Sequence, residues 1–228
     1  MEWKPFANKH QGERCFILGN APSLVDENLS LLRGENVFIT NRGQRAKDIG
    51  LDHFDYHVVL DPVFYNDYAV EMSEVKEGIR FYPGTIKDHV NYKGEDFVPI
   101  YSVPTLQQGK LDRRKLMDAK NFPTSYTNGW TKTGNTVLTA SLIAYFMGFT
   151  EIYILGTEWI YKKSSTHFYK DTSNRENNVP DGHKTKGFKY LPAFAEFFKT
   201  KKVKFVNLSK KFAYKHLMDS GNLEDIIK

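Results

Sequence analysis

The sequence predicts a doubly wound α/β fold, with a Rossmann-like, mostly parallel sheet in a single domain over residues 1–228. Short apolar runs that are typical of buried strands alternate along the chain with segments of helical pattern. In addition, polar residues follow three consecutive strands of this kind: Asn20, Asn41 and Asp61. Because the carboxyl ends of parallel strands lie at one edge of a sheet, we expect these side chains to meet there and form a site.

Each expected strand is a short apolar run that is bounded by glycine, proline or a polar residue. The runs are residues 15–18, 36–41, 56–60, 79–82, 98–103, 151–155 and 203–208. The third run stops before Asp61-Pro62, because proline cannot continue a central strand, and this leaves Asp61 at the rim of the sheet. The run 151–155 has the pattern of a central strand and leads into Gly156-Thr157-Glu158.

Helical patterns fill much of the sequence between these runs. They cover residues 24–34, 64–75, 137–147, 182–199 and 212–218. The segment 137–147 is apolar almost all round, which is typical of a buried helix, and Gly148 follows it as a suitable end. The polar segment up to Gln11 is expected to be a loosely held arm. We expect a lid-like insertion at about residues 159–181, because long polar loops in compact domains are commonly functional.

The composition is that of a globular protein that works inside the cell. Among 228 residues, 40% are hydrophobic and 26% are charged, which is ordinary for a soluble domain. No apolar run approaches the roughly 20 residues that span a bilayer, and the first residues do not form a signal peptide. The single cysteine, Cys15, excludes an internal disulfide and is expected in the core in a reducing compartment. These observations predict a cytoplasmic protein.

The formal net charge of +5 arises largely near the C-terminus. Lysines gather from Lys184 onward, and they include Lys199, Lys201, Lys202, Lys204, Lys210, Lys211 and Lys215. A basic end of this kind attracts anionic partners, although it is more often a solvated face. We expect no nucleic-acid partner. Peripheral contact with the inner face of a membrane, and a homo-oligomer, are left open by the sequence.

The segment Gly19-Asn20-Ala21-Pro22-Ser23, where the first strand meets the following turn, is the first candidate site. A helix N-terminus there would offer free N–H groups and a partial positive charge to an anion. Gly19 permits a tight turn and a close backbone approach, Asn20 can hydrogen-bond a sugar or a base, and Ser23 can cap the turn or contact phosphate. A capped turn without a ligand explains the same residues, since the three-glycine Rossmann pattern is absent.

A second turn of this kind precedes the apolar segment 137–147. Thr133, Gly134 and Asn135 would present another helix N-terminus to a phosphate group. The turn shares its composition, but not its upstream glycine spacing, with Gly-Lys-Thr phosphate loops.

Together these motifs resemble, in order, the bacterial CMP-sialic-acid-dependent sialyltransferases of the lipooligosaccharide type. The first loop, extended to Leu24, is similar to the Gly-Asn-Gly-Pro-Ser-Leu nucleotide loop of that family, and Asn41 is similar to its asparagine after strand two. Asp61-Pro62 corresponds to Asn-Pro, and Thr133-Gly134 to Ser-Gly. The run 148–158 is similar to Gly-Tyr-Lys-Glu-Ile-Tyr-Leu-Ser-Gly-Ile-Asp, and Gly182-His183-Lys184 to the Gly-His-Ser that carries the catalytic histidine.

The resemblance, which covers about residues 14–210, implies a glycosyltransferase. It would move a nonulosonic acid, a sialic-acid-like sugar, from a CMP donor to a glycan acceptor without a metal or another cofactor. His183 would be the general base that removes the proton of the acceptor hydroxyl. The nucleotide-binding residues would be Gly19, Asn20, Ala21, Ser23, Asn41, Asp61, Thr133, Gly134 and Glu158.

The chain departs from this family after the strand at 151–155. Two tyrosines bind the leaving phosphate in the family, and a gapless match places Ile160 and Thr166 at their positions. The candidates to replace them are Tyr161, Lys162, His167 and Tyr169.

The same loop and fold also resemble a wider group of proteins. It includes glycosyltransferases of the motility-accessory type and archaeal 6-hydroxymethylpterin diphosphokinases, which transfer pyrophosphate from Mg-ATP. Under this alternative Asp61 and Glu158 could hold the magnesium ion. His183 favours the glycosyltransferase, and a non-catalytic nucleotide-binding module is a third alternative.

Overall fold

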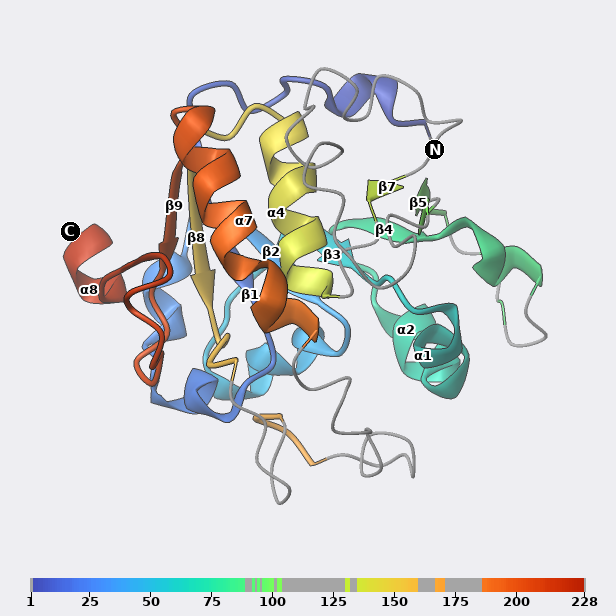
Figure 1. Cartoon of the computed structure of the whole chain (residues 1–228). Helices are drawn as coiled ribbons and strands as arrows, with labels where there is room; N and C mark the ends of the chain where they lie inside the picture. Colours follow the sequence, from blue (N-terminus) through green and yellow to red (C-terminus); the bar gives the residue numbers. More distant parts are fainter. Residues whose placement is uncertain are drawn as a thin grey trace.

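A parallel sheet of eight strands forms the centre of the computed structural model (Figure 1). The structure describes residues 2–88, 92, 94, 96–100, 102–103, 130–131, 135–159, 167–170 and 186–227. Across the sheet the strands are β10 (Asp219–Ser220), β9 (Lys204–Asn207), β8 (Glu151–Leu155), β1 (Arg14–Leu18), β2 (Asn36–Thr40), β3 (Tyr56–Val58), β4 (Ile79–Pro83) and β5 (Val98–Ile100). Every neighbouring pair is parallel. The predicted α/β fold with a parallel sheet is therefore confirmed.

Two segments outside this sheet, β6 (Ser102–Val103) and β7 (Trp130–Thr131), form a further parallel pair. The helices are α1 (Pro62–Asp67), α2 (Ala69–Glu74), α4 (Thr136–Phe146), α7 (Lys186–Thr200) and α8 (Leu223–Ile226). Shorter 3₁₀ helices are η1 (Lys4–Phe6), η2 (Pro22–Asp26), η3 (Leu29–Leu32), η4 (Gly43–Ile49) and η5 (Gly84–Asp88). In the described part of the chain, no helix has both the length and the apolar character needed to cross a bilayer.

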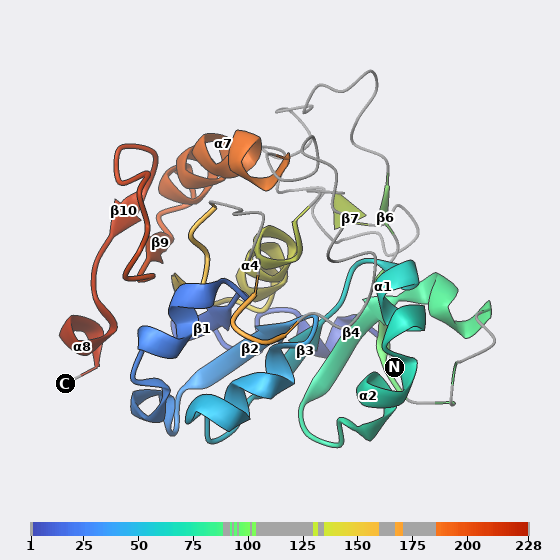
Figure 2. The ribbon, with the colours of Figure 1, turned by 90° about the horizontal axis from the view of Figure 1, so that it is seen from below.

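Alternate residues of the central strands serve two different cores, because successive side chains of a strand point to opposite faces. Cys15 and Ile17 of β1 pack on the face that α4 and α7 cover (Figures 1 and 2). Phe16 and Leu18 pack on the opposite face, together with residues of η2, η3 and α8. All four β1 side chains are fully buried. Burial of one such large apolar side chain stabilises a fold by about 1.5–3 kcal/mol, so the apolar run at 15–18 anchors both layers.

The order of the strands fixes where a ligand can bind. From β1 the chain adds β2 to β5 on one side, whereas β8, β9 and β10 lie on the other side. Strand order thus reverses between β1 and β8. In open α/β sheets the crevice at the carboxyl ends of such a strand pair is the usual binding position.

Four expectations about local structure were wrong or need refinement. The segment up to Gln11 is docked rather than loose, since Trp3 and Phe6 are buried in the core. The helix expected at 24–34 is two 3₁₀ turns, and the one at 64–75 divides into α1 and α2. Residues 212–218 contain no helix but turns, and their apolar spacing arises because Phe212 and Met218 are separately buried against the core.

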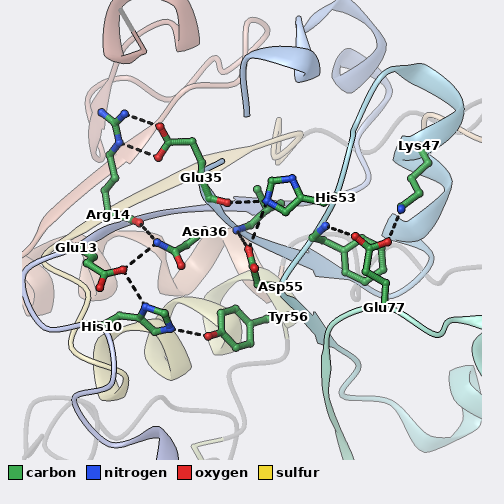
Figure 3. Close-up of polar contacts among 12 residues, drawn as sticks. His10, Glu13, Arg14, Glu35, Asn36, Lys47, His53, Asp55, Tyr56 and Glu77 are labelled. Atoms are coloured by element: carbon green, nitrogen blue, oxygen red, sulfur yellow. Dashed lines mark hydrogen bonds and ion pairs between the residues drawn. The ribbon is translucent and has the colours of Figure 1, made fainter. Parts of the chain in front are cut away.

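The amino end of the sheet is closed by a network of paired polar side chains (Figure 3). Nδ1 of His10 lies 2.9 Å from Oε2 of Glu13, and Nε2 of His10 lies 2.5 Å from the hydroxyl of Tyr56. The imidazole also stacks on the ring of Phe149, with the centroids 4.5 Å apart. Arg14 donates through Nε to Glu35 at 2.9 Å. This network attaches the N-terminal segment to β1, β2 and β3.

Candidate functional site

A cavity of about 210 Å³ lies at the carboxyl ends of β1, β2 and β8, beside the N-terminus of α4. This is the position that the reversal of strand order predicts. The cavity is lined by Gly19, Asn20, Ala21, Thr40, Asn41, Asn135, Thr136, Val137, Gly156, Thr157, Glu158, Trp159 and His167.

The loops after β1 and β8 touch through their backbones. The N–H of Gly19 donates to the carbonyl of Leu155 at 2.8 Å, and that of Ala21 donates to the carbonyl of Gly156 at 2.9 Å. A Cβ on Gly19 would lie only 2.4 Å from the Gly156 oxygen. Gly156 itself has a φ of +61°, which L side chains rarely adopt. The close backbone approach expected at Gly19 is made to Gly156.

Glu158 fills the position that the sequence analysis assigned to an anionic ligand. Its Oε1 accepts from the backbone N–H of Ser23 at 2.6 Å, at the start of η2. The side chain of Ser23 is fully buried, and Ser23 is not one of the residues that line the cavity. The N–H of Ser23 is therefore already bonded to a protein carboxylate. Earlier residues of the first loop, from Gly19 to Ala21, line the cavity.

Asn20 and Asn41 both line the cavity. The amide nitrogen of Asn20 donates to the carbonyl of Thr40 at 2.9 Å, whereas its Oδ1 is buried and has no hydrogen-bond partner among the described residues. Asn41 has a left-handed backbone, with a φ of +52°, and its Oδ1 accepts from Thr136 at 3.4 Å. Asn41 thus joins β2 to the first turn of α4.

A buried histidine holds Asn41 in place. His57 of β3 lies with Nε2 2.6 Å from the carbonyl of Asn41 and with Nδ1 2.8 Å from the hydroxyl of Tyr82. Complete burial lowers the pKa of His57 to about 4, so the imidazole is neutral at neutral pH. A neutral ring that donates from Nε2 and accepts at Nδ1 satisfies both contacts. His57 is a supporting residue that the sequence analysis missed, because it lies inside an apolar run.

The N-terminus of α4 is the position in the cavity that best suits an anion. Asn135 caps this helix of 11 residues, and its side chain accepts from the N–H of Leu138 at 3.1 Å. Thr136 and Val137 of the first turn line the cavity. Free N–H groups and the helix dipole at such an end attract phosphate.

The segment 167–170 returns to the cavity from beyond β8. The N–H of Phe168 donates to the carbonyl of Asn20 at 2.9 Å, and His167 lines the cavity. The rings of His167 and Tyr169 stack with centroids 5.0 Å apart. Arg42 lies over the ring of Tyr169 at 4.8 Å. Of the four leaving-phosphate candidates, His167 is therefore in the cavity lining, and Tyr169 supports it.

Six of the predicted site residues line the cavity: Gly19, Asn20, Ala21, Asn41, Glu158 and His167. Asp61 does not; it is exposed at the end of β3. Thr133, Gly134, Tyr161, Lys162 and His183 lie outside the described residues, as does most of the lid-like insertion at 159–181. Four lining residues that adjoin the predicted ones were not predicted from the sequence: Thr40, Thr136, Thr157 and Trp159.

The two carboxylates that could hold magnesium under the pterin diphosphokinase alternative do not share a site. Glu158 lines the cavity and accepts from Ser23, whereas Asp61 is exposed and does not line it. Within the described ranges, no group of three or more His, Cys, Asp or Glu side chains is placed to hold a metal ion.

No protein-family model and no curated protein sequence matches this chain. Solved structures do match, and they define the class of fold, which is that of a group of glycosyltransferases. The sialyltransferase CstII from Campylobacter jejuni, in complex with the substrate analogue cytidine-5′-monophosphate, is similar with a TM-score of 0.50 and 14% identity. That match covers 92% of this chain and 85% of CstII.

Two further structures extend the comparison. A structure of the sialyltransferase CST-II with a trisaccharide acceptor and CMP is similar with a TM-score of 0.52 and 16% identity, over 92% of this chain and 87% of that chain. The MAf glycosyltransferase from Magnetospirillum magneticum AMB-1 has a TM-score of 0.57 and 14% identity, over 96% of this chain and 35% of that chain. The predicted resemblance to sialyltransferases and motility-accessory glycosyltransferases is thus confirmed for the fold.

Proposed function

We propose that this protein is a glycosyltransferase that moves a sugar from a CMP-activated donor to a hydroxyl group of a glycan acceptor. One observation carries the proposal. The cavity lies where strand order reverses, and Asn20, Asn41 and the N-terminus of α4 line it, in a fold shared with sialyltransferases whose solved structures contain CMP. Amide side chains suit the hydroxyls and base of a nucleoside, and a helix N-terminus suits its phosphate.

The chemical roles come from the resemblance of the motifs in the sequence. The transferred sugar would be a nonulosonic acid, and His183 would remove the proton of the acceptor hydroxyl as it attacks the anomeric carbon. The CMP phosphate would leave with the electrons of the broken bond. The first turn of α4 and His167 would stabilise the charge that develops on it. In this proposal no metal takes part.

Binding of nucleotides tests the donor. We expect CMP to raise the melting temperature of the protein equally with and without magnesium, and to do so more than CDP, UDP or ATP, because a ligand that binds only the folded state stabilises it. Stabilisation by Mg-ATP alone would contradict the proposal and favour the pterin diphosphokinase alternative.

A second measurement tests the base. His183→Ala is expected to abolish sugar transfer while CMP still stabilises the variant about as strongly as the wild type. The expected contribution of a general base is about 10²–10⁴ in rate. Equal loss of transfer and of CMP binding would show that His183 holds the nucleotide instead.

A further inference from the structure

Trp159 carries a buried hydrogen-bond donor that has no acceptor among the described residues. Its side chain is only 7% exposed and the residue lines the cavity. The indole Nε1 is buried, and no residue in the described part of the chain accepts a hydrogen bond from it. Buried donors of this kind are rare in folded proteins, because an unmade hydrogen bond destabilises the fold. An unpaired buried donor on a residue that lines a cavity indicates a ligand that supplies the acceptor.

The backbone of Trp159 supports the same interpretation. Its φ is +58°, in the left-handed region, which is unusual for a bulky residue. Thr157, two residues earlier, is held by β9 and the residues that follow it, since Asn207 donates to the carbonyl of Thr157 at 3.1 Å and the N–H of Thr157 donates to Ser209 at 2.9 Å. Strained backbone held by such a frame is found preferentially at functional sites.

The position of the indole in the core indicates which part of a nucleotide it meets. Trp159 belongs to the apolar cluster that also contains Val137 and Leu138, in the first turn of α4. Val137 lines the cavity as well. The indole donor and the free N–H groups of α4 therefore lie on the same side of the sheet, where the cavity is suited to an anion.

We propose that the indole N–H of Trp159 binds an oxygen of the nucleotide phosphate, together with the first turn of α4. This inference rests on the proposed function and refines it, since Trp159 becomes a specificity-determining residue that selects nucleotides over nucleosides. A hydrogen bond from a neutral donor to a charged oxygen is stronger than one to a neutral group.

The chain contains a matched control at the other end of the sheet. Trp3 is 3% exposed, and its Nε1 donates to the carbonyl of Pro99 at 2.7 Å. Trp159→Phe and Trp3→Phe remove the same volume of side chain from a buried site. The difference between the two variants therefore isolates the role of the N–H group.

We expect opposite results from the two variants. Trp3→Phe loses a hydrogen bond within the protein, so its melting temperature should fall by about 4 °C more than that of Trp159→Phe, with unchanged affinity for CMP. Trp159→Phe should bind CMP about 10- to 100-fold more weakly than the wild type does. Its affinity for cytidine should equal that of the wild type. Both Kd values can be measured by titration calorimetry.

The remaining outcomes separate this inference from the proposed function. Unchanged affinity of Trp159→Phe for CMP, or an equal loss for CMP and cytidine, overturns the phosphate contact. The wild type is also titrated with uridine and UMP and with adenosine and AMP. A preference for one of those pairs contradicts the CMP donor, and Trp159 is then tested with that pair by the same criterion. Failure to bind any pair overturns both proposals.

Discussion

The two ends of the parallel sheet use polar side chains in different ways. At the amino end His10 is in contact with both Glu13 and Tyr56, and Arg14 donates to Glu35 (Figure 3). At the carboxyl end, buried polar atoms such as Asn20 Oδ1 and Trp159 Nε1 have no partner among the described residues. A network with its partners in place stabilises a fold, whereas unpaired buried atoms beside a cavity indicate binding.

The molecule thus divides stability and function between the two ends of the sheet. The N-terminal segment is attached at the amino end, far along the strands from the cavity, so changes there should affect stability without changing affinity. Changes at the carboxyl end should affect affinity, and they alter stability only where they disturb the loops that touch or the support of Asn41. Three predictions test this division.

The largest effect is expected for Gly19→Ala. The new Cβ would lie 2.4 Å from the carbonyl oxygen of Gly156, and backbone atoms cannot move aside as a flexible side chain does. We expect a loss of about 3 kcal/mol in the free energy of unfolding, which is the upper end of typical overpacking, and loss of stabilisation by CMP. Chemical denaturation measures the first and thermal melting the second.

Gly221→Ala is the matched control for that substitution. A Cβ there would meet Leu208 at 3.4 Å, an ordinary contact, so stability and CMP binding should change little. If Gly19→Ala behaved in the same way as this control, the contact between the loops after β1 and β8 would not determine the shape of the cavity.

The pH dependence of stability tests the support of Asn41. The pKa of His57 is lowered from 6.5 to about 4 by burial. Because the folded pKa is the lower one, the stability that the neutral ring contributes is complete above pH 6.5 and is lost as the pH falls through 4. The loss attributable to His57 is roughly 3 kcal/mol, since each pH step between the two pKa values is about 1.4 kcal/mol.

His57→Gln, which does not titrate, isolates this contribution. Protonation of carboxylates with a lowered pKa, such as Glu71, also lowers the stability of the protein in acid. The difference in unfolding free energy between wild type and His57→Gln, measured from pH 7 to 4, removes their share. Parallel curves for the two proteins would show that His57 does not titrate in this range.

The smallest effect is expected for Tyr56→Phe at the amino end. The substitution removes the hydroxyl that lies 2.5 Å from Nε2 of His10 and accepts from Lys9 at 3.4 Å. We expect a loss of about 1–2 kcal/mol in the free energy of unfolding, the usual result of leaving a buried polar group unpaired. Affinity for CMP, measured by calorimetry, should equal that of the wild type. A weaker affinity would show that the two ends of the sheet are coupled.

The sheet could be predicted from the sequence because its strands are short apolar runs, buried on both faces, that stop at glycine, proline or amide residues. The same logic located Asn20, Asn41 and Glu158 in the cavity lining. It failed for Asp61, which ends a strand farther from the point where strand order reverses and is exposed. A polar residue at a strand end thus predicted the cavity lining only for β1 and its two neighbours, β2 and β8.

Other features depend on contacts between distant segments, and no local pattern reveals them. The carboxylate of Glu158 at the N–H of Ser23 is one example, and the imidazole of His57 at the carbonyl of Asn41 is another. Trp159 was missed because an aromatic residue after a strand reads as core. It differs from Trp3 in that it lines the cavity and that no described residue accepts from its N–H, whereas the N–H of Trp3 donates to Pro99.

The contact between the loops after β1 and β8 has a consequence for folding. Ser23 and Glu158, which meet there, are 135 residues apart in the chain. Bringing such remote segments together is slow compared with forming local structure, and it has an entropic cost. A chain that has folded only as far as β5 lacks one wall of the cavity. Any ligand of this cavity therefore binds only after the two halves of the sheet have joined, and it stabilises the complete topology rather than an intermediate.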